Sequence, residues 1–314
     1  MSQMMKVPEI VSVGSALVDE QYLVSNLPEL DGGAYVYEES RAFGGVAANV
    51  AVALSRLGHS TGVIALLGND ANADRVEENL LDEGVATDRL KRSDDEPSTY
   101  CMVFRDQEGK GTMVTGGGAA KHLALVSEDE DYLRSAEVIF ANGFCPDRVM
   151  SRLSDMAADD DIQLAFDLAS SLEELEDRAT ERETIDEILP HLALFVANEV
   201  SIHSYLGARN EEAVEILRNR GVRRGALTRG EDGALLWDSE EIIEVPAFNV
   251  EVVDTTGAGD AFVGGLIHKW LLAGESAEKT GRFAAAAGGY SCTKESARDG
   301  LADENRIETF LNER

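Results

Sequence analysis

The sequence predicts an α/β fold built on a mostly parallel central sheet. The 314 residues alternate short apolar runs, rich in β-branched residues, with amphipathic helical stretches. Several of these stretches end at a glycine just after the last apolar turn, as helices commonly do. Repeated strand–helix alternation requires crossover connections, which make neighbouring strands parallel and bury the sheet. Because no low-complexity linker divides the chain, we expect a single domain over residues 1–314.

The individual elements follow from these runs. The expected strands of the sheet are residues 9–14, 61–68, 137–143, 162–168, 192–199 and 225–230. The expected helices include residues 46–58, 74–84 and 211–221, and a further long helix beginning near residue 258. Two segments, at about residues 15–41 and 98–117, are β-rich and lack a helical pattern. They predict antiparallel strands of a small separate sheet, which is either a lid over a cleft or a pair of surface hairpins.

The composition excludes several classes of function. Asp and Glu number 59 against 28 Lys and Arg, so the net charge is −31 and argues against nucleic-acid binding or attachment to an anionic membrane. This acidity fits an ordinary acidic enzyme or, as we favour, a halophilic protein of a salt-rich cytoplasm. Three cysteines without CxxC spacing indicate neither a zinc site nor a disulfide framework. No apolar run is long enough for a signal sequence or a membrane span, so we expect a cytoplasmic protein.

The stretch VVDTTGAGDAF, residues 252–262, predicts a binding site for an anion. It reads as a strand end, then two threonines, then Gly257-Ala258-Gly259 at the start of a helix. The first N–H groups of a helix lack intrahelical partners, and glycines let an anion approach them closely. Thr255 or Thr256 is expected to cap this helix.

Asp260 places a carboxylate within the first turn of the same helix. An acid at a helix N-terminus can be simple stabilisation of the helix dipole. If the backbone holds a transferring phosphoryl group, the carboxylate can instead accept the proton of an incoming hydroxyl group. The second arrangement predicts a phosphotransferase.

With a second stretch, FGGVAANVAVALSRLG at residues 43–58, this motif resembles the signatures of the ribokinase-like (PfkB) carbohydrate kinases. VGSALVD, ANEVS and LTRGEDGALL extend the resemblance over nearly the whole chain. It implies a three-layer α/β/α fold with a β lid, and an ATP-dependent, Mg²⁺-dependent kinase of a sugar or related polyol or sugar acid. It also implies a homodimer formed through the lid.

The resemblance assigns roles to residues of both signatures. Asp260 would be the catalytic base, and the N–H groups of Gly257, Ala258 and Gly259 would form the anion hole. The acceptor's hydroxyl groups would be held by residues near the first signature. These are Asp19, Gly44, Gly45 and Asn49.

The resemblance also implies a nucleotide site. Thr228, Gly230 and Gly233 would contact ATP, although the same stretch fits a glycine-rich hairpin turn. Asn198 matches the first residue of the family's N-x-x-E motif, which orders the Mg-bound phosphates. Its fourth position is Ser201 in place of Glu, which leaves the adjacent Glu199 as the candidate for an indirect Mg²⁺ contact.

Two further positions concern a monovalent cation. In the family such an ion often lies near the first Asp of the second signature, which makes Asp254 the candidate for K⁺. The loop that would complete this site carries Ser296 where glycine is usual.

The acceptor itself is left open between several classes. Kinases of sugar phosphates in the family tend to carry Lys in the first glycine motif, whereas this chain has Val46, so a neutral polyol or a nucleoside is favoured. A non-catalytic sugar- or nucleotide-binding regulator is the alternative outside catalysis. A dinucleotide-dependent reductase is disfavoured because no G-x-G-x-x-G follows the first strand.

Overall fold

Within the residues that the computed structural model describes, 8–159, 162–178 and 180–314, the central sheet has nine strands. Their order is β13-β12-β11-β10-β9-β8-β1-β4-β5, and every neighbouring pair from β11 to β5 is parallel. The bounds are β1 Ile10–Val13, β4 Thr61–Gly68, β5 Ala86–Ser93, β8 Val138–Asn142, β9 Gln163–Asp167, β10 Leu194–Asn198, β11 Gly225–Thr228, β12 Ala234–Trp237 and β13 Ile242–Val245. The predicted α/β class and the six predicted strands are confirmed.

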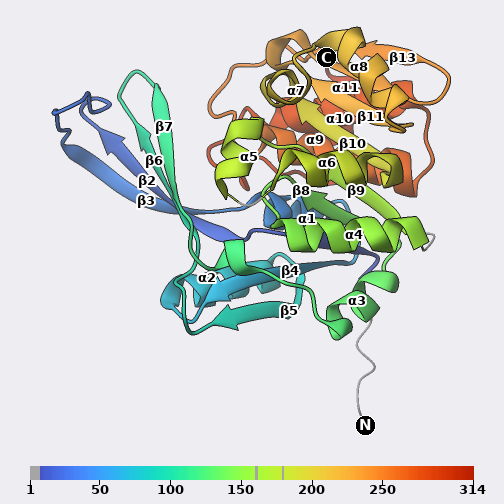
Figure 1. Ribbon diagram of the computed structural model, residues 1–314. Helices are drawn as coiled ribbons and strands as arrows, with labels where there is room; N and C mark the ends of the chain where they lie inside the picture. The colour runs from blue at the N-terminus through green and yellow to red at the C-terminus, as the bar shows by residue number, and fades with distance from the viewer. Residues whose placement is uncertain (1–7, 160–161, 179) are drawn as a thin grey trace.

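Helices cover both faces of this sheet and give the three predicted layers (Figure 1). Side chains such as Val11 and Ile139 pack against α3–α8, whereas Ile10 and Phe140 point to the opposite face and pack against α1 and α9. Alternate residues of the buried strands therefore fill the hydrophobic cores on the two faces of the sheet. The helices are α1 Val46–Arg56, α2 Ala71–Asp82, α3 Ser127–Arg134, α4 Asp147–Asp159, α5 Leu172–Arg178, α6 Arg182–Ile188, α7 Glu199–Leu206, α8 Asn210–Asn219, α9 Ala258–Leu266, α10 Ala277–Ser291 and α11 Glu304–Asn312.

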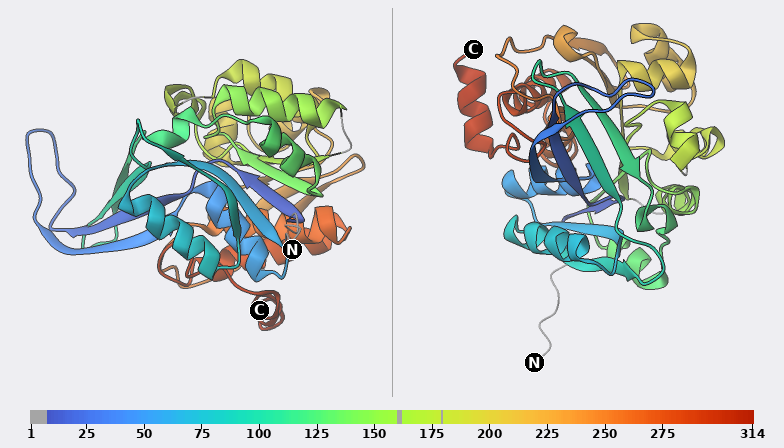
Figure 2. Two further views of the ribbon diagram at one scale, coloured as in Figure 1. Left: turned by 90° about the horizontal axis from the view of Figure 1, so that it is seen from below. Right: turned by 90° about the vertical axis from the view of Figure 1, so that its left-hand side faces the viewer.

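The two β-rich inserts form one small sheet that projects from the body (Figure 2). Its order is β3-β2-β6-β7, with β2 Leu17–Val24, β3 Val36–Gly44, β6 Tyr100–Arg105 and β7 Gly111–Gly116. Each hairpin is antiparallel as predicted, but β2 and β6 pair in parallel, so the expectation of a wholly antiparallel sheet was wrong. The cause is that β2 follows β1 and β6 follows β5, and these two strands of the main sheet run in the same direction.

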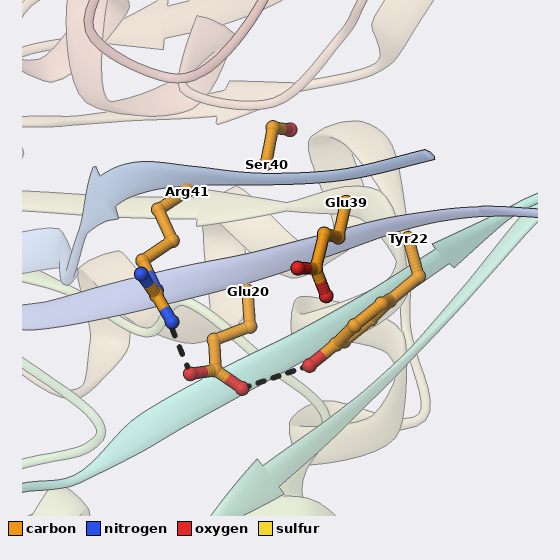
Figure 3. A pocket seen from close by; sticks show the side chains of 5 residues that line it. All are labelled: Glu20, Tyr22, Glu39, Ser40 and Arg41. Atoms are coloured by element: carbon orange, nitrogen blue, oxygen red, sulfur yellow. Dashed lines mark hydrogen bonds and ion pairs between the residues drawn. The ribbon is translucent and has the colours of Figure 1, made fainter. Parts of the chain in front are cut away.

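The two faces of this small sheet, the predicted lid, carry different residues because side chains alternate along a strand. Glu20, Tyr22, Glu39 and Arg41 line a pocket of about 220 Å³ on one face, where the Tyr22 hydroxyl donates to Glu20 at 2.9 Å (Figure 3). Asp19, the neighbour of Glu20, points to the other face and is buried. The pocket in Figure 3 is therefore separate from the predicted acceptor site.

Candidate active site

The predicted nucleotide residues lie at the carboxyl edge of the main sheet. Asn198 ends β10 and Thr228 ends β11, and the two are register partners in the parallel pair. Asp167 ends the next strand, β9. Ligands of open α/β sheets bind at this edge.

Asp260 on α9 contacts one of the predicted acceptor residues, Asn49 on α1. The Asn49 side-chain amide donates from Nδ2 to Asp260 Oδ2 at 2.8 Å. Asn49 is buried at 4% exposure, so it is not a solvated residue of the helix surface. Asp19 lies directly against Gly44, where any side chain would overlap its carboxylate. Gly45, with φ +94°, is the N-cap residue immediately before α1.

Burial controls the protonation of these carboxyl groups. It raises the pKa of Asp260 to about 7, and the nearby carboxylates Asp167 and Asp19 act in the same direction, while the Asn49 hydrogen bond and Arg298 oppose it. Burial likewise raises the pKa of Asp19 to about 6, against the attraction of Arg298. A base is most effective when its pKa lies near the working pH, so Asp260 is suited to accept a proton.

The start of α9 is the place where the sequence predicts a backbone cradle for an anion. Gly257 has φ +81°, and a Cβ there would lie 2.5 Å from the carbonyl oxygen of Ala297. A Cβ on Gly259 would meet no atom within 4 Å, so the space above this residue is open. The N–H of Ala258 donates to the Thr255 carbonyl at 3.2 Å. The open side of the cradle is therefore at Gly259.

The expected side-chain cap of α9 by Thr255 or Thr256 was wrong. Gly257 is the N-cap residue immediately before α9, and no side chain caps the helix. Thr256 instead donates to Asp254 Oδ1 from its N–H at 2.9 Å and from its hydroxyl at 2.7 Å. The threonine is thus used to hold Asp254.

Asp254 is paired with Arg105 of the small sheet. Arg105, the last residue of β6, donates from Nη2 to Asp254 Oδ2 at 2.7 Å and to Thr256 Oγ1 at 3.2 Å. Burial alone would raise the pKa of Asp254, but the hydrogen bonds from Thr256 and Arg105 outweigh it and leave the pKa below its ordinary value. The Asp254 carboxylate, the candidate ligand for K⁺, is therefore paired with the Arg105 guanidinium.

Asn198 and Ser201, the first and fourth residues of the N-x-x-E stretch, hydrogen-bond to each other at the start of α7. Asn198 caps α7 by accepting from the Ser201 N–H at 2.8 Å, and Ser201 Oγ accepts from the Asn198 N–H at 3.0 Å. Serine thereby closes a reciprocal cap and is fully buried. Glu199 pairs with Arg209 at 2.7 Å. Among the described residues, the Glu199 carboxylate has no hydrogen bond to another candidate site residue.

The stretch after Thr228 forms a hairpin turn between β11 and β12. The Arg229 N–H donates to the Gly233 carbonyl at 2.7 Å, and Gly230 and Gly233 have φ of +60° and +82°. The hairpin interpretation of this stretch is therefore correct. The turn also follows the carboxyl end of β11, which keeps it beside the predicted nucleotide site.

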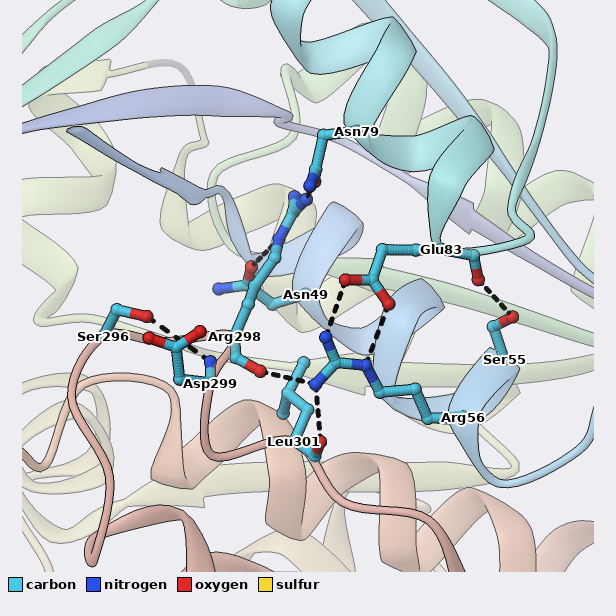
Figure 4. Close-up of polar contacts among 9 residues, drawn as sticks. All are labelled: Asn49, Ser55, Arg56, Asn79, Glu83, Ser296, Arg298, Asp299 and Leu301. Carbon is cyan, nitrogen blue, oxygen red and sulfur yellow. Dashed lines mark hydrogen bonds and ion pairs between the residues drawn. The ribbon is translucent and has the colours of Figure 1, made fainter.

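Two residues of this region were not predicted from the sequence. Asp167 has its pKa raised to about 6 by burial and lies near enough to Asp260 to raise that residue's pKa. Its signal was available, because it is the polar end of a buried apolar strand. Arg298 lies in the loop after α10 and donates from Nε to Asn49 Oδ1 at 3.1 Å (Figure 4). No local pattern in the sequence distinguishes this buried arginine from the arginines of the surface.

A model of the family described as pfkB family carbohydrate kinase matches residues 7–304. The chain belongs to this family of carbohydrate kinases. It is 27% identical to the ATP-dependent ribose-1-phosphate kinase of Halopiger xanaduensis over 97% of this chain and 98% of that protein. The ribokinase of Haemophilus influenzae is 25% identical over 86% of this chain and 87% of its own length. The resemblance predicted from the two signatures is confirmed.

The fold of this kinase matches solved structures of the same kind. The structure of Arabidopsis thaliana ribokinase complexed with ribose and ATP aligns with a TM-score of 0.86 over 98% of this chain and 99% of that one, at 24% identity. The likeness confirms the ribokinase-like three-layer fold and its small sheet. In the part of this kinase that the structure describes, no helix could cross a membrane, and no three His, Cys, Asp or Glu side chains are grouped to hold a metal ion.

Proposed function

We propose that this kinase transfers the γ-phosphoryl group of ATP to a hydroxyl group of a sugar, with Asp260 as general base. The position of Asp260 is the observation that carries the proposal. It stands in the first turn of α9, beside the open cradle at Gly259, and is hydrogen-bonded to Asn49 on the acceptor side. The Asp260 carboxylate thus lies beside the predicted places of both the phosphoryl group and the acceptor hydroxyl group, which a phosphoryl transfer must bring together.

The proposed step forms one bond to the γ-phosphorus and breaks another. Asp260 Oδ1 takes the proton of the acceptor hydroxyl as its oxygen bonds to the γ-phosphorus. The bond from that phosphorus to the β–γ bridging oxygen breaks, and ADP leaves with the electron pair. The N–H groups at the start of α9 stabilise the charge on the phosphoryl oxygens. Asp19 and the backbone at Gly44 and Gly45 orient the acceptor.

Magnesium is assigned to the nucleotide and not to a protein carboxylate. ATP carries Mg²⁺ on its phosphates, where the ion neutralises developing charge. Ser201 is enclosed in the helix cap and Glu199 is paired with Arg209, so neither supplies the carboxylate of the N-x-x-E motif. Asn198 and Thr228 line the sheet edge where the phosphates would lie.

Arg105 supports a second class of acceptor, one that carries its own anionic group. The guanidinium donates through Nη2, and the described residues provide no hydrogen bond for its Nε and Nη1. A sugar phosphate could pair with those donors. The Halopiger relative is named a ribose-1-phosphate kinase, which favours this class over the neutral acceptor that Val46 suggests.

A coupled assay of ADP release tests the proposal. MgATP is offered in molar KCl with free sugars, ribose 1-phosphate, ribose 5-phosphate, sugar acids and nucleosides, and with the Asp260→Asn variant as the blank. We expect turnover with a free or phosphorylated pentose. If the acceptor is phosphorylated, Arg105→Ala should raise its KM about tenfold or more, the loss of one charged hydrogen-bonding partner. Turnover with nucleosides alone would favour the nucleoside kinase, and none with any acceptor would favour the binding regulator.

The remaining expectations stay predictions. The edge strands β3 and β7 of the lid have unpaired edges among the described residues. Tyr35, Tyr37 and Met113 are exposed by 51% or more. These features support a homodimer formed through the lid. The acidic surface supports a halophilic protein of the cytoplasm.

A further inference from the structure

Arg298 is a buried cation that forms hydrogen bonds with three elements around the predicted acceptor residues. Only 5% of the residue is exposed. Its Nε donates to Asn49 Oδ1 at 3.1 Å, its Nη1 donates to Asn79 Oδ1, and its Nη2 lies 3.4 Å from the Gly44 carbonyl oxygen (Figure 4). A buried charge is retained only where its donors find partners, and here they find them on three separate elements.

The chemistry of the three groups decides which way the Asn49 amide points. A guanidinium has donors and no acceptor, so the amide must turn its oxygen toward Arg298. Its NH₂ group is then left for Asp260, whose ionised carboxylate can only accept. Both contacts are present, at 3.1 Å and 2.8 Å. The reversed amide would place donor against donor and acceptor against acceptor.

We propose that Arg298 is a positioning residue, which fixes the Asn49 amide so that it holds Oδ2 of Asp260 and leaves Oδ1 for the acceptor hydroxyl. The inference rests on the proposed role of Asp260 as base. In this arrangement Asn49 orients the carboxylate of Asp260, in addition to making the acceptor contact that the family resemblance implies. Without Arg298 the amide can rotate, and the carboxylate loses its fixed donor.

The charges around Asp260 give this arrangement a measurable consequence. Asp19 and Asp167 face it with carboxylates, and Arg298 faces it with the opposing charge. The Asn49 hydrogen bond and Arg298 both act to lower the pKa of Asp260, against burial and the two acids. Removing Arg298 removes both influences, because the hydrogen bond depends on the amide orientation. The pKa of Asp260 must then rise.

Arg56 provides a matched control for disturbance of the loop. Its Nη1 donates to the carbonyl oxygens of Arg298 and Leu301, each at 2.6 Å, and the guanidinium pairs with Glu83 at 2.6 Å (Figure 4). It therefore anchors the same loop from the opposite side. No hydrogen bond joins it to Asn49 or Asp260 within the described residues.

The test measures the pKa of Asp260 directly, by ¹³C NMR titration of aspartate-labelled protein, with its resonance identified by its absence from Asp260→Asn. Arg298→Met and Asn49→Leu should each raise this pKa by about one unit or more, a tenfold change in the protonation equilibrium. The double variant should shift it by clearly less than the sum, because one variant already removes what the other acts through. Arg56→Lys should lower the Tm and leave the pKa in place.

Several results would overturn the inference. An unchanged pKa of Asp260 in Arg298→Met would leave Arg298 with a structural role only. Additive pKa shifts in the double variant would show that Arg298 does not act through the Asn49 amide. An equal pKa shift in Arg56→Lys would show that the effect comes from disturbance of the loop. If Arg298→Met does not fold, Arg298→Lys serves instead, since it keeps the charge and loses the guanidinium fork; a pKa equal to that of the wild type would then contradict the inference. These titrations need no turnover, so their failure is distinct from an absence of kinase activity, which would contradict the proposed function.

Discussion

Replacing Asp260 with asparagine is expected to lower turnover by about two to four decades, the usual contribution of a general base. The amide has nearly the shape of the carboxylate but cannot accept a proton from the acceptor. Binding of MgATP should change little, because the cradle at Gly257–Gly259 is backbone. Single-turnover kinetics and calorimetric titration of MgATP measure the two effects separately.

The control for this variant is Glu20→Gln, which removes a lid carboxylate on the face away from Asp19. It should keep turnover close to that of the wild type. Turnover retained in Asp260→Asn would remove the assignment of the base. A parallel loss of MgATP affinity would instead indicate that the carboxylate serves the nucleotide.

The second large effect is expected at Gly259, where stability and activity should change in opposite directions. Gly259→Ala adds a Cβ that no protein atom opposes within 4 Å. Alanine is better than glycine within a helix by about 1 kcal/mol, so the Tm should stay level or rise. The added methyl group occupies the space above the cradle, and kcat/KM for MgATP should fall about a hundredfold, as when one donor to a phosphoryl or oxyanion group is lost.

Gly257→Ala is the matched comparison, because its defect lies in the fold. Position 257 has φ +81°, and the new Cβ would lie 2.5 Å from the Ala297 carbonyl oxygen. The Tm should fall together with activity. Thermal unfolding and MgATP kinetics of both variants make the comparison. If Gly259→Ala is fully active, the phosphates lie elsewhere than above this residue.

Much of the fold could be predicted from local patterns. The buried strands β1, β4 and β8 to β11 are apolar runs, and glycine ends mark the helices between them. Strand β5 carries ATDRLKRS and lies at the edge of the sheet, so its sequence lacks a buried pattern. The parallel pairing of β2 with β6 depends on how both inserts leave the main sheet, which no local pattern contains.

In the candidate site too, the features encoded by one local stretch could be predicted, and the contacts between distant stretches could not. The signature around Asp260 is contiguous, so the helix start and its carboxylate could be predicted together. The strand end expected at Val252 and Val253 was wrong, because both valines are exposed and no strand lies between β13 and α9, where the structure describes every residue. The contact of Arg105 with Asp254 joins residues 149 positions apart, and that of Arg298 with Asn49 joins residues 249 apart. Such contacts exist only once the lid and the last loop are in place. The departure at Ser201 was visible in the sequence, but its use as a reciprocal cap was not.

The pH dependence of kcat/KM is the most direct test of Asp260 as the general base, because it reports the ionisation of the free enzyme's base. With the pKa of Asp260 raised to about 7, the base is half protonated near pH 7. The rate should therefore fall about tenfold per pH unit on the acid side. We expect one such limb, with its midpoint near pH 7, in the wild type and no limb in the residual activity of Asp260→Asn. A flat wild-type profile from pH 5.5 to 8.5, or a limb that persists in the variant, would contradict it.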